Sequence, residues 1–217
     1  ATTDLYFQRI IGSLSLLVAA ADMVATTDAV LARAMLVEGL LASLFGDHGT
    51  IQPGEFGEVV LSSPAMEAVL STGTDLLLQG FALSLAGRYS NAAPVLREAL
   101  ATMGREGDIV AHAARPAVLA LYASYEIWDE AGGDETVKLL EDQQREAGAL
   151  GALGLTLVCR SSCELRAGRF AAAMTCLDEA EILCAVIGEQ SPGAAYRVEL
   201  LAWSGRIDPD GNSYSFQ

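Results

Sequence analysis

The chain has 217 residues and a formal net charge of −15, with 52% hydrophobic residues, mostly alanine and leucine, and 6% aromatic residues. This length suits one large domain or one run of repeats, and alanine and leucine favour helix because they lose little side-chain freedom there. An acidic surface repels phosphate backbones, so we expect no direct contact with nucleic acid.

The most apolar segment, residues 10–21, is shorter than the roughly 18 residues that a membrane-spanning helix requires. It contains Gly12, Ser13 and Ser15, and it lacks the basic start and the small-residue cleavage pattern of a signal peptide. The sequence therefore predicts a cytoplasmic protein that does not enter a membrane.

The cysteines share one short apolar segment with helical periodicity and are Cys159, Cys163, Cys176 and Cys184. Cys159 and Cys163 are one helical turn apart and face the same way. A structural zinc site would take four cysteine or histidine ligands at turn-like spacing, but the two histidines, His48 and His112, are far away in sequence. We therefore predict free buried thiols in a reducing compartment, with no metal and no cofactor.

Helical periodicity of apolar residues extends through the N-terminal third, without sustained strand alternation. Thr27 or Asp28 is suited to cap a helix, because both have side-chain oxygens that accept from a backbone amide. Glycine and proline indicate a loop before residue 55. The predicted segments are a helix over residues 4–23, a second helix ending near Phe45, a loop that includes residues 46–49 and Pro53-Gly54, and a short helix over residues 55–61.

From about residue 72 the pattern becomes repetitive. A predicted helix over residues 74–85 is ended by Gly87, and a similar sequence returns 81 residues later, at Gly168. Two units of about forty residues fit this interval, a length typical of helical-hairpin repeats. The middle copy, near residues 128–147, is degenerate and has Gly132-Gly133 where the others have an aromatic residue. The shared positions are Gly87, Tyr89, Ala92 and Leu96 in the first copy, and Gly168, Phe170, Ala173 and Leu177 in the last.

Each shared position has a predicted role. The glycines close one helix in a left-handed turn, and the alanines allow two helices to approach closely. Tyr89 and Phe170 are expected to start the next helix and to lie largely buried, wedged against the helix before it. Pro94 either kinks its helix or marks a late start. Because one hairpin cannot bury both of its faces, we expect an all-α fold, a right-handed α-solenoid of antiparallel helix hairpins.

The repetitive pattern also suggests the domain organisation. We expect a single helical-repeat domain over residues 1–206, in which residues 1–71 form N-terminal helices and residues 72–206 form the hairpin repeats. Residues 207–217 are rich in aspartate, glycine, asparagine and serine, so we expect them to form a tail or a linker.

The spacing Gly87-x-Tyr89-x-x-Ala92-x-x-x-Leu96 resembles the second half of a tetratricopeptide repeat, and so does the copy from Gly168. A longer likeness extends over residues 10–206, which resemble the helical-repeat region of large ATP-binding LuxR-type transcriptional regulators of actinobacteria, relatives of MalT. The segments that carry this likeness are residues 28–33, 75–83, 127–130, 145–150 and 200–206.

The resemblance implies a helical sensor arm between a nucleotide-binding module and a helix-turn-helix. The chain has no phosphate-binding loop, and we expect no helix-turn-helix after Arg206, so the chain would be a fragment or a shortened relative. The implied partners are the other domains of a parent regulator, or a protein or peptide, with a possible small-molecule effector. The alternative is a free-standing tetratricopeptide-like adaptor that binds a peptide or helix in its groove.

One group of residues is the candidate ligand site. Tyr122 and Tyr125 are three residues apart and share a helix face, with Trp128 and Arg115 on the same predicted helix. Aromatic and guanidinium groups on a concave face could bind a small acidic or aromatic ligand. The simpler interpretation is packing within and between repeats.

Two charged groups have alternative interpretations. The carboxylates of Asp129, Glu130, Asp134 and Glu135 could bind Mg²⁺ or act in acid–base chemistry, although capping and starting the helix that follows, where negative charge meets the helix dipole, is the simpler explanation. Arg160, Arg166 and Arg169 could form a basic patch, but solvated or salt-bridged arginines are the simpler interpretation. No serine–histidine–aspartate arrangement is visible, so we predict that the chain is not an enzyme.

Overall fold

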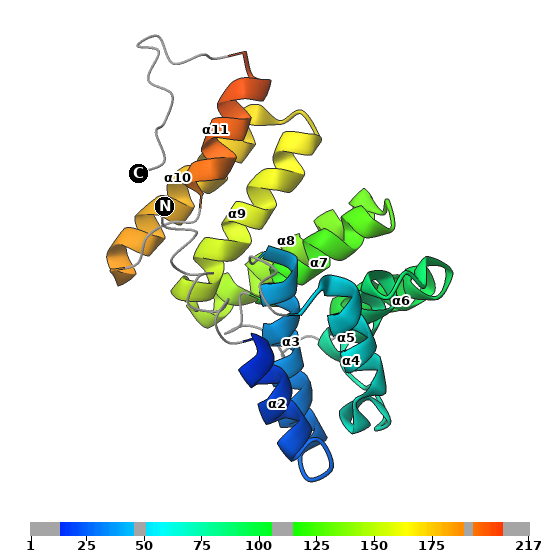
Figure 1. Cartoon of the computed structure of the whole chain (residues 1–217). Helices are drawn as coiled ribbons and strands as arrows, with labels where there is room; N and C mark the ends of the chain where they lie inside the picture. Colours follow the sequence, from blue (N-terminus) through cyan, green and yellow to red (C-terminus); the bar gives the residue numbers. More distant parts are fainter. Residues whose placement is uncertain (1–13, 46–50, 106–114, 189–192, 206–217) are drawn as a thin grey trace. The chain divides into compact units, whose positions relative to one another are not determined.

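A computed structural model of the chain describes residues 14–45, 51–105, 115–188 and 193–205, and within them all regular structure is helical, as Figure 1 shows. This confirms the predicted all-α class. No described helix is both long enough and apolar enough to cross a membrane. The helices are α2 (Leu14–Val24), α3 (Ala29–Phe45), α4 (Pro53–Ser62), the 3-10 helix η1 (Pro64–Met66), α5 (Gly73–Leu85), α6 (Tyr89–Arg105), α7 (Arg115–Glu126), α8 (Glu130–Ala147), α9 (Leu150–Arg166), α10 (Phe170–Ile187) and α11 (Ala194–Trp203).

The chain forms two compact units. The N-terminal unit contains α2 to α6 together with residues 123–129, and the C-terminal unit contains residues 115–122 together with α8 to α11. The division therefore falls within α7. The expected domain from residue 1 to 206, with its subdivision at residue 71, stays a prediction, and the expected tail at 207–217 lies outside the described residues.

The N-terminal helices begin where short polar or cyclic residues favour a helix start. The amide of Leu31 donates to Asp28 Oδ1 at 2.9 Å, so Asp28 is the cap of α3, while the Thr27 hydroxyl donates back to Val24 O. The expected loop at Pro53-Gly54 is wrong, because α4 already begins at Pro53. Proline is favoured there, since the first helical residue needs no amide donor.

The core of the N-terminal unit is built around the contact of α4 with α5. The Phe56 ring is fully buried, and Gly57 lies so close to α5 that a Cβ at that position would be 2.6 Å from Ala82 O. The α3 helix contacts α4, α5 and η1, and it buries Leu36 and Leu40. Close packing at a glycine therefore fixes the separation of α4 from α5.

Three turns that recur about every forty residues have the same backbone geometry, which the turn at Gly148 (65°) between α8 and α9 also shares. The residue with positive φ is Gly87 (74°), Trp128 (57°) or Gly168 (74°), and each of the three donates its amide to the carbonyl three residues earlier. The next amide in each turn donates to the carbonyl five residues earlier, which is the pattern of a Schellman helix end. The middle copy is therefore anchored at Trp128, 41 residues after Gly87 and 40 before Gly168. The expected equivalence of Gly132-Gly133 with the aromatic position is wrong, because both glycines lie inside α8.

This alignment places buried residues at matching positions in α6, α8 and α10. Counted from the left-handed residue, the fifth, ninth, twelfth and sixteenth following positions are buried in all three helices, at a spacing that forms one helix stripe. The four sets are Ala92, Gly133 and Ala173; Leu96, Val137 and Leu177; Ala99, Leu140 and Ala180; and Met103, Gln144 and Cys184.

The predicted aromatic wedge is wrong for Tyr89, which is 66% exposed, whereas Phe170 is half-buried against the core of the C-terminal unit. Glu130, the corresponding residue of α8, is exposed. The position is the first residue of its helix, where the Cα–Cβ bond points back over the turn. The buried stripe begins only three residues later, at Ala92 in the first copy.

Pro94 lies inside α6, which runs without interruption from Tyr89 to Arg105. The alternative of a late helix start is therefore excluded. Because proline has no amide hydrogen, the carbonyl of Ser90 loses its helical donor, and Ser90 is an exposed residue.

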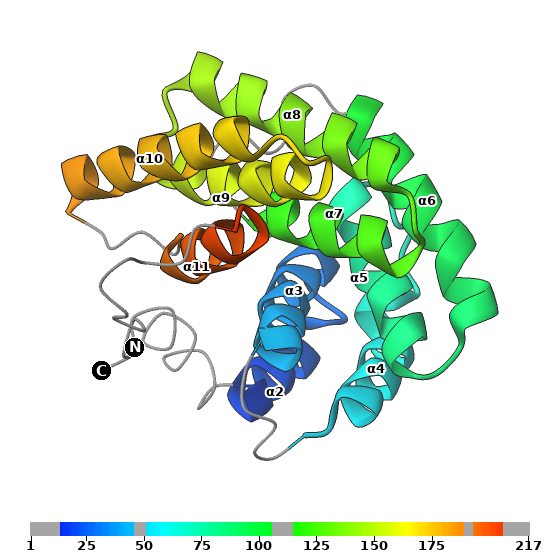
Figure 2. The same ribbon diagram turned by 90° about the horizontal axis from the view of Figure 1, so that it is seen from above.

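In the C-terminal unit, α9 and α10 lie side by side, as Figure 2 shows, and α11 contacts both. Their shared core consists of Leu153, Leu157, Val158, Ala173, Leu177, Ala180 and Leu200. A Cβ on Gly154 would lie 3.1 Å from Cys184 Sγ, and Gly73, 81 residues earlier, faces Met103 in the same way. The α5–α6 and α9–α10 pairs therefore repeat the same close contact between their two helices.

Candidate functional site

The four residues of the predicted ligand site are divided between the two units. Arg115 and Tyr122, both half-buried, belong to the C-terminal unit. Tyr125, which is half-buried, and Trp128, which is 87% exposed, belong to the N-terminal unit. A single ligand site formed by all four stays a prediction.

Tyr122 is held within the C-terminal unit by a side-chain hydrogen bond with Tyr196 of α11. Burial raises the pKa of Tyr122 above its ordinary value, and the bond to Tyr196 offsets part of that increase. The Tyr122 hydroxyl therefore stays protonated at neutral pH, and its observed contact supports a packing role.

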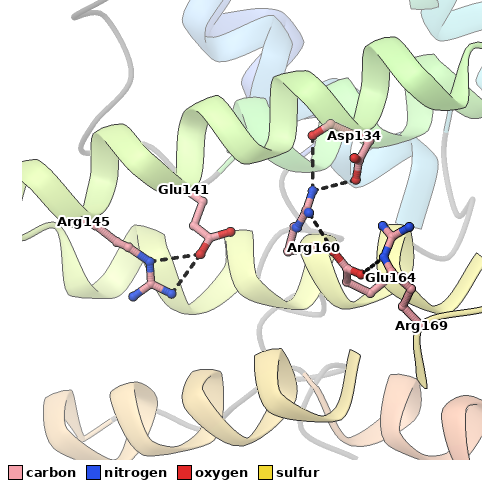
Figure 3. Close-up of polar contacts among 6 residues, drawn as sticks. All are labelled: Asp134, Glu141, Arg145, Arg160, Glu164 and Arg169. Carbon is pink, nitrogen blue, oxygen red and sulfur yellow. Dashed lines mark hydrogen bonds and ion pairs between the residues drawn. The ribbon is translucent and has the colours of Figure 1, made fainter. Parts of the chain in front are cut away.

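A network of ion pairs connects α8 and α9 (Figure 3). Arg160 Nη1 lies 2.6 Å from Asp134 Oδ1, and Arg160 Nη2 lies 2.6 Å from Glu164 Oε1. The second oxygen of Glu164 pairs with Arg169, which follows the left-handed Gly168. The Glu164 side chain is only 7% exposed, and two guanidinium groups compensate the burial of its charge.

Two further arginines of the C-terminal unit, Arg166 and Arg145, are also paired with carboxylates. Arg166 Nη2 lies 2.7 Å from Glu130 Oε1, and Arg145 bridges Glu141 and Glu179 at 2.8 and 2.5 Å (Glu141 in Figure 3). Salt bridges, the alternative to a basic patch, are thus confirmed for Arg160, Arg166 and Arg169. Among the described residues, no three histidine, cysteine or acidic side chains are grouped to hold a metal ion.

These ion pairs predict a loss of stability in acid. Hydrogen bonds from Arg169 and Arg145 lower the pKa of Glu164 and Glu179, respectively, below the ordinary value of 4.5. The folded state therefore binds fewer protons than the unfolded chain, and the stabilisation is complete above that value and lost as the pH falls through the lower folded-state pKa. We expect the urea midpoint to fall between pH 7 and pH 3, and to fall less in Glu164→Gln. An equal fall in the two proteins would contradict this assignment.

The four cysteines are free thiols, as the sequence predicts, but only Cys159 and Cys184 are buried, whereas Cys163 and Cys176 are half-buried. Burial raises the pKa of Cys163 to about 12 and that of Cys176 to about 11. The thiolate is the reactive form, so at pH 8 we expect Cys176 to be alkylated by iodoacetamide about a hundredfold more slowly than a thiol with the ordinary pKa of 9.0. Mass spectrometry of the folded and the urea-unfolded protein measures the ratio, and equal rates would contradict it.

A buried ion pair in the N-terminal unit was not predicted from the sequence. Arg33 Nε donates to Asp75 Oδ1 at 2.8 Å, and Arg33 Nη1 donates to Ala65 O at 2.9 Å. The two side chains are 6% and 12% exposed. The pair thus joins α3, α5 and η1 in a buried position. The available signal was that Arg33 is the one basic residue of α3 and Asp75 is the one acidic residue of α5, in two mostly apolar helices.

The most unusual exposed residue is Trp128. It has a left-handed backbone, which a bulky L-residue rarely adopts, and the residue is 87% exposed, so packing does not explain it. Glu126 and Asp129 lie beside it in the same unit. The Ser84 hydroxyl donates to Glu126, which connects this turn to the end of α5.

Comparisons of the chain with protein-family models, with curated proteins and with solved structures find no match. The geometry contributes repeated helix turns, paired charges and one exposed tryptophan at a left-handed position.

Proposed function

We propose that the chain is a non-catalytic sensor and interaction arm of a LuxR-type transcriptional regulator, built from tetratricopeptide-like hairpins in a right-handed solenoid. The observation that supports this most is the same left-handed turn at residues 87, 128 and 168 with the buried positions that follow it. Helix-hairpin arrays of this period expose long surfaces for partners. The likeness of residues 10–206 to the helical region of such regulators supplies the regulatory context.

In this proposal an effector or another domain of the regulator binds the arm and shifts its conformational equilibrium. Such a shift requires only that the ligand has different affinities for two states of the arm. ATP binding and DNA binding would belong to other domains of the same cytoplasmic regulator. The chain acts by transmitting the binding of the effector to those domains.

The reading frame around the coding segment tests this proposal directly. A phosphate-binding loop encoded upstream and a helix-turn-helix downstream would support the regulator arm. A start codon near residue 1 with a stop codon near residue 217 would overturn it. In thermal-shift screening of the purified chain with metabolites and maltodextrins, a saturable rise in Tm would identify the effector, because binding to the folded state alone stabilises it.

A free-standing adaptor that binds a peptide or helix is the second candidate. The exposed Trp128 favours it, because tryptophan is enriched among the residues that dominate protein interfaces. Fusion of the chain to a neighbouring ATP-binding module would exclude this candidate, and an isolated reading frame would favour it.

A further inference from the structure

Trp128 occupies a position where the two equivalent turns have glycine. All three residues have positive φ and the same two turn hydrogen bonds, so the backbone requirement is shared. Glycine meets this requirement without steric conflict, whereas the Cβ of tryptophan lies close to neighbouring backbone atoms. A bulky side chain at such a position destabilises the turn locally.

Among the described residues, no packing of the Trp128 side chain compensates for the strain of its backbone. Because the residue is 87% exposed, its side chain buries too little apolar area to offset the backbone strain. The two glycine turns also make the same hydrogen bonds without a side chain, so the indole is not needed to form the turn. Local rules of folding are broken most often where a side chain serves a function.

We propose that Trp128 anchors a partner protein through an arginine- or lysine-rich segment of that partner. Tryptophan is the best aromatic partner for a cation over its ring face. Glu126 and Asp129 flank it within the N-terminal unit, and the exposed Glu126 is oriented by the Ser84 hydroxyl. The net charge of −15 attracts a basic segment over a longer range and repels nucleic acid and anionic lipid.

Trp203 provides a matched comparison within the same chain. It is also a largely exposed tryptophan, at 69%, but it is the last residue of helix α11 and has no positive φ. An exposed indole at Trp203 therefore imposes no backbone strain. If exposure alone attracted cationic peptides, the two tryptophans would contribute equally to binding.

The test measures fluorescence anisotropy of a labelled, amidated nine-residue peptide of alternating arginine and glycine, titrated with the full chain. A peptide with citrulline in place of arginine is the charge control, and Trp128→Gly and Trp203→Ala are the variants. We expect Trp128→Gly to weaken binding about three- to thirtyfold, the range of cation–π contributions. Trp203→Ala should bind as the unmodified chain does, and the citrulline peptide should not bind.

Stability separates an anchoring role from a structural one. Because Trp128→Gly removes the strain, its Tm should stay unchanged or rise by up to about 4 °C. A Tm lower by several degrees, an unchanged affinity in Trp128→Gly, or no binding of the arginine peptide would each overturn the proposal. The proposal for Trp128 depends on the proposed function in one respect only, namely that the chain binds another protein. An isolated reading frame would overturn the regulator arm and leave this result unaffected.

Discussion

Replacing Arg33 with alanine is expected to lower the free energy of unfolding of the N-terminal unit by about 3–5 kcal/mol, because it leaves the Asp75 carboxylate buried without its ionic partner. The two side chains are 6% and 12% exposed, and their N–O distance is 2.8 Å. The carbonyl of Ala65 would also lose a guanidinium donor. Urea unfolding followed by circular dichroism at 222 nm measures the change.

A surface ion pair of the same unit is the matched control. Arg88 Nη2 lies 2.7 Å from Glu58 Oε2, but the two side chains are 49% and 56% exposed. Arg88→Ala should therefore cost at most about 1 kcal/mol, because solvent screens exposed pairs. The double variant Arg33→Met with Asp75→Leu removes both charges and should recover most of the lost stability. A small effect of Arg33→Ala would show that the pair is solvated in solution.

The sequence was sufficient to predict those parts of the fold that depend on local chemistry. Asp28 caps α3 as one of two predicted candidates, and Gly87 and Gly168 adopt the predicted left-handed turns. These features need only a side-chain oxygen at a helix start, or the freedom of glycine at a helix end. The predicted helices at residues 55–61 and 74–85 correspond to α4 and α5, with starts two and one residues earlier.

Prediction failed where a residue departs from the usual local preference, or where the neighbour lies far away in the chain. The sequence pattern places Gly132-Gly133 at the aromatic position of the middle copy and misses the turn at Trp128, because a tryptophan with positive φ is not expected from residue preferences. The pairing of Arg33 with Asp75, 42 residues apart, depends on tertiary packing of α3 against α5. For the candidate site, the sequence identified Trp128 as a candidate ligand-binding aromatic residue. Its left-handed backbone conformation could be seen only in the structure.

The second large effect is expected at Leu96, which is fully buried in α6 and lies directly over Gly80 of α5. Leu96→Ala should cost about 2–5 kcal/mol, through lost transfer free energy and the cavity that remains. Tyr89→Ala in the same helix should change stability by no more than about 0.5 kcal/mol, because Tyr89 is 66% exposed. Equal effects of the two substitutions would contradict the buried register of α6.

Gly80 lies against the Leu96 side chain, so a substitution at Gly80 tests the same contact from the other helix. A Cβ on Gly80 would lie 2.4 Å from Leu96 Cδ2 and 2.7 Å from Leu96 Cγ, so Gly80→Ala alone should destabilise the protein by overpacking. In the Leu96→Ala variant, the methyl group introduced by Gly80→Ala can occupy the space that the leucine side chain leaves. Replacing glycine by alanine at position 80 also adds about 1 kcal/mol of helix propensity. Gly80→Ala should therefore change sign, destabilising the original protein and stabilising the Leu96→Ala variant. A double-mutant cycle in urea measures the coupling, and the same sign in both backgrounds would show that Leu96 does not fill the space over Gly80.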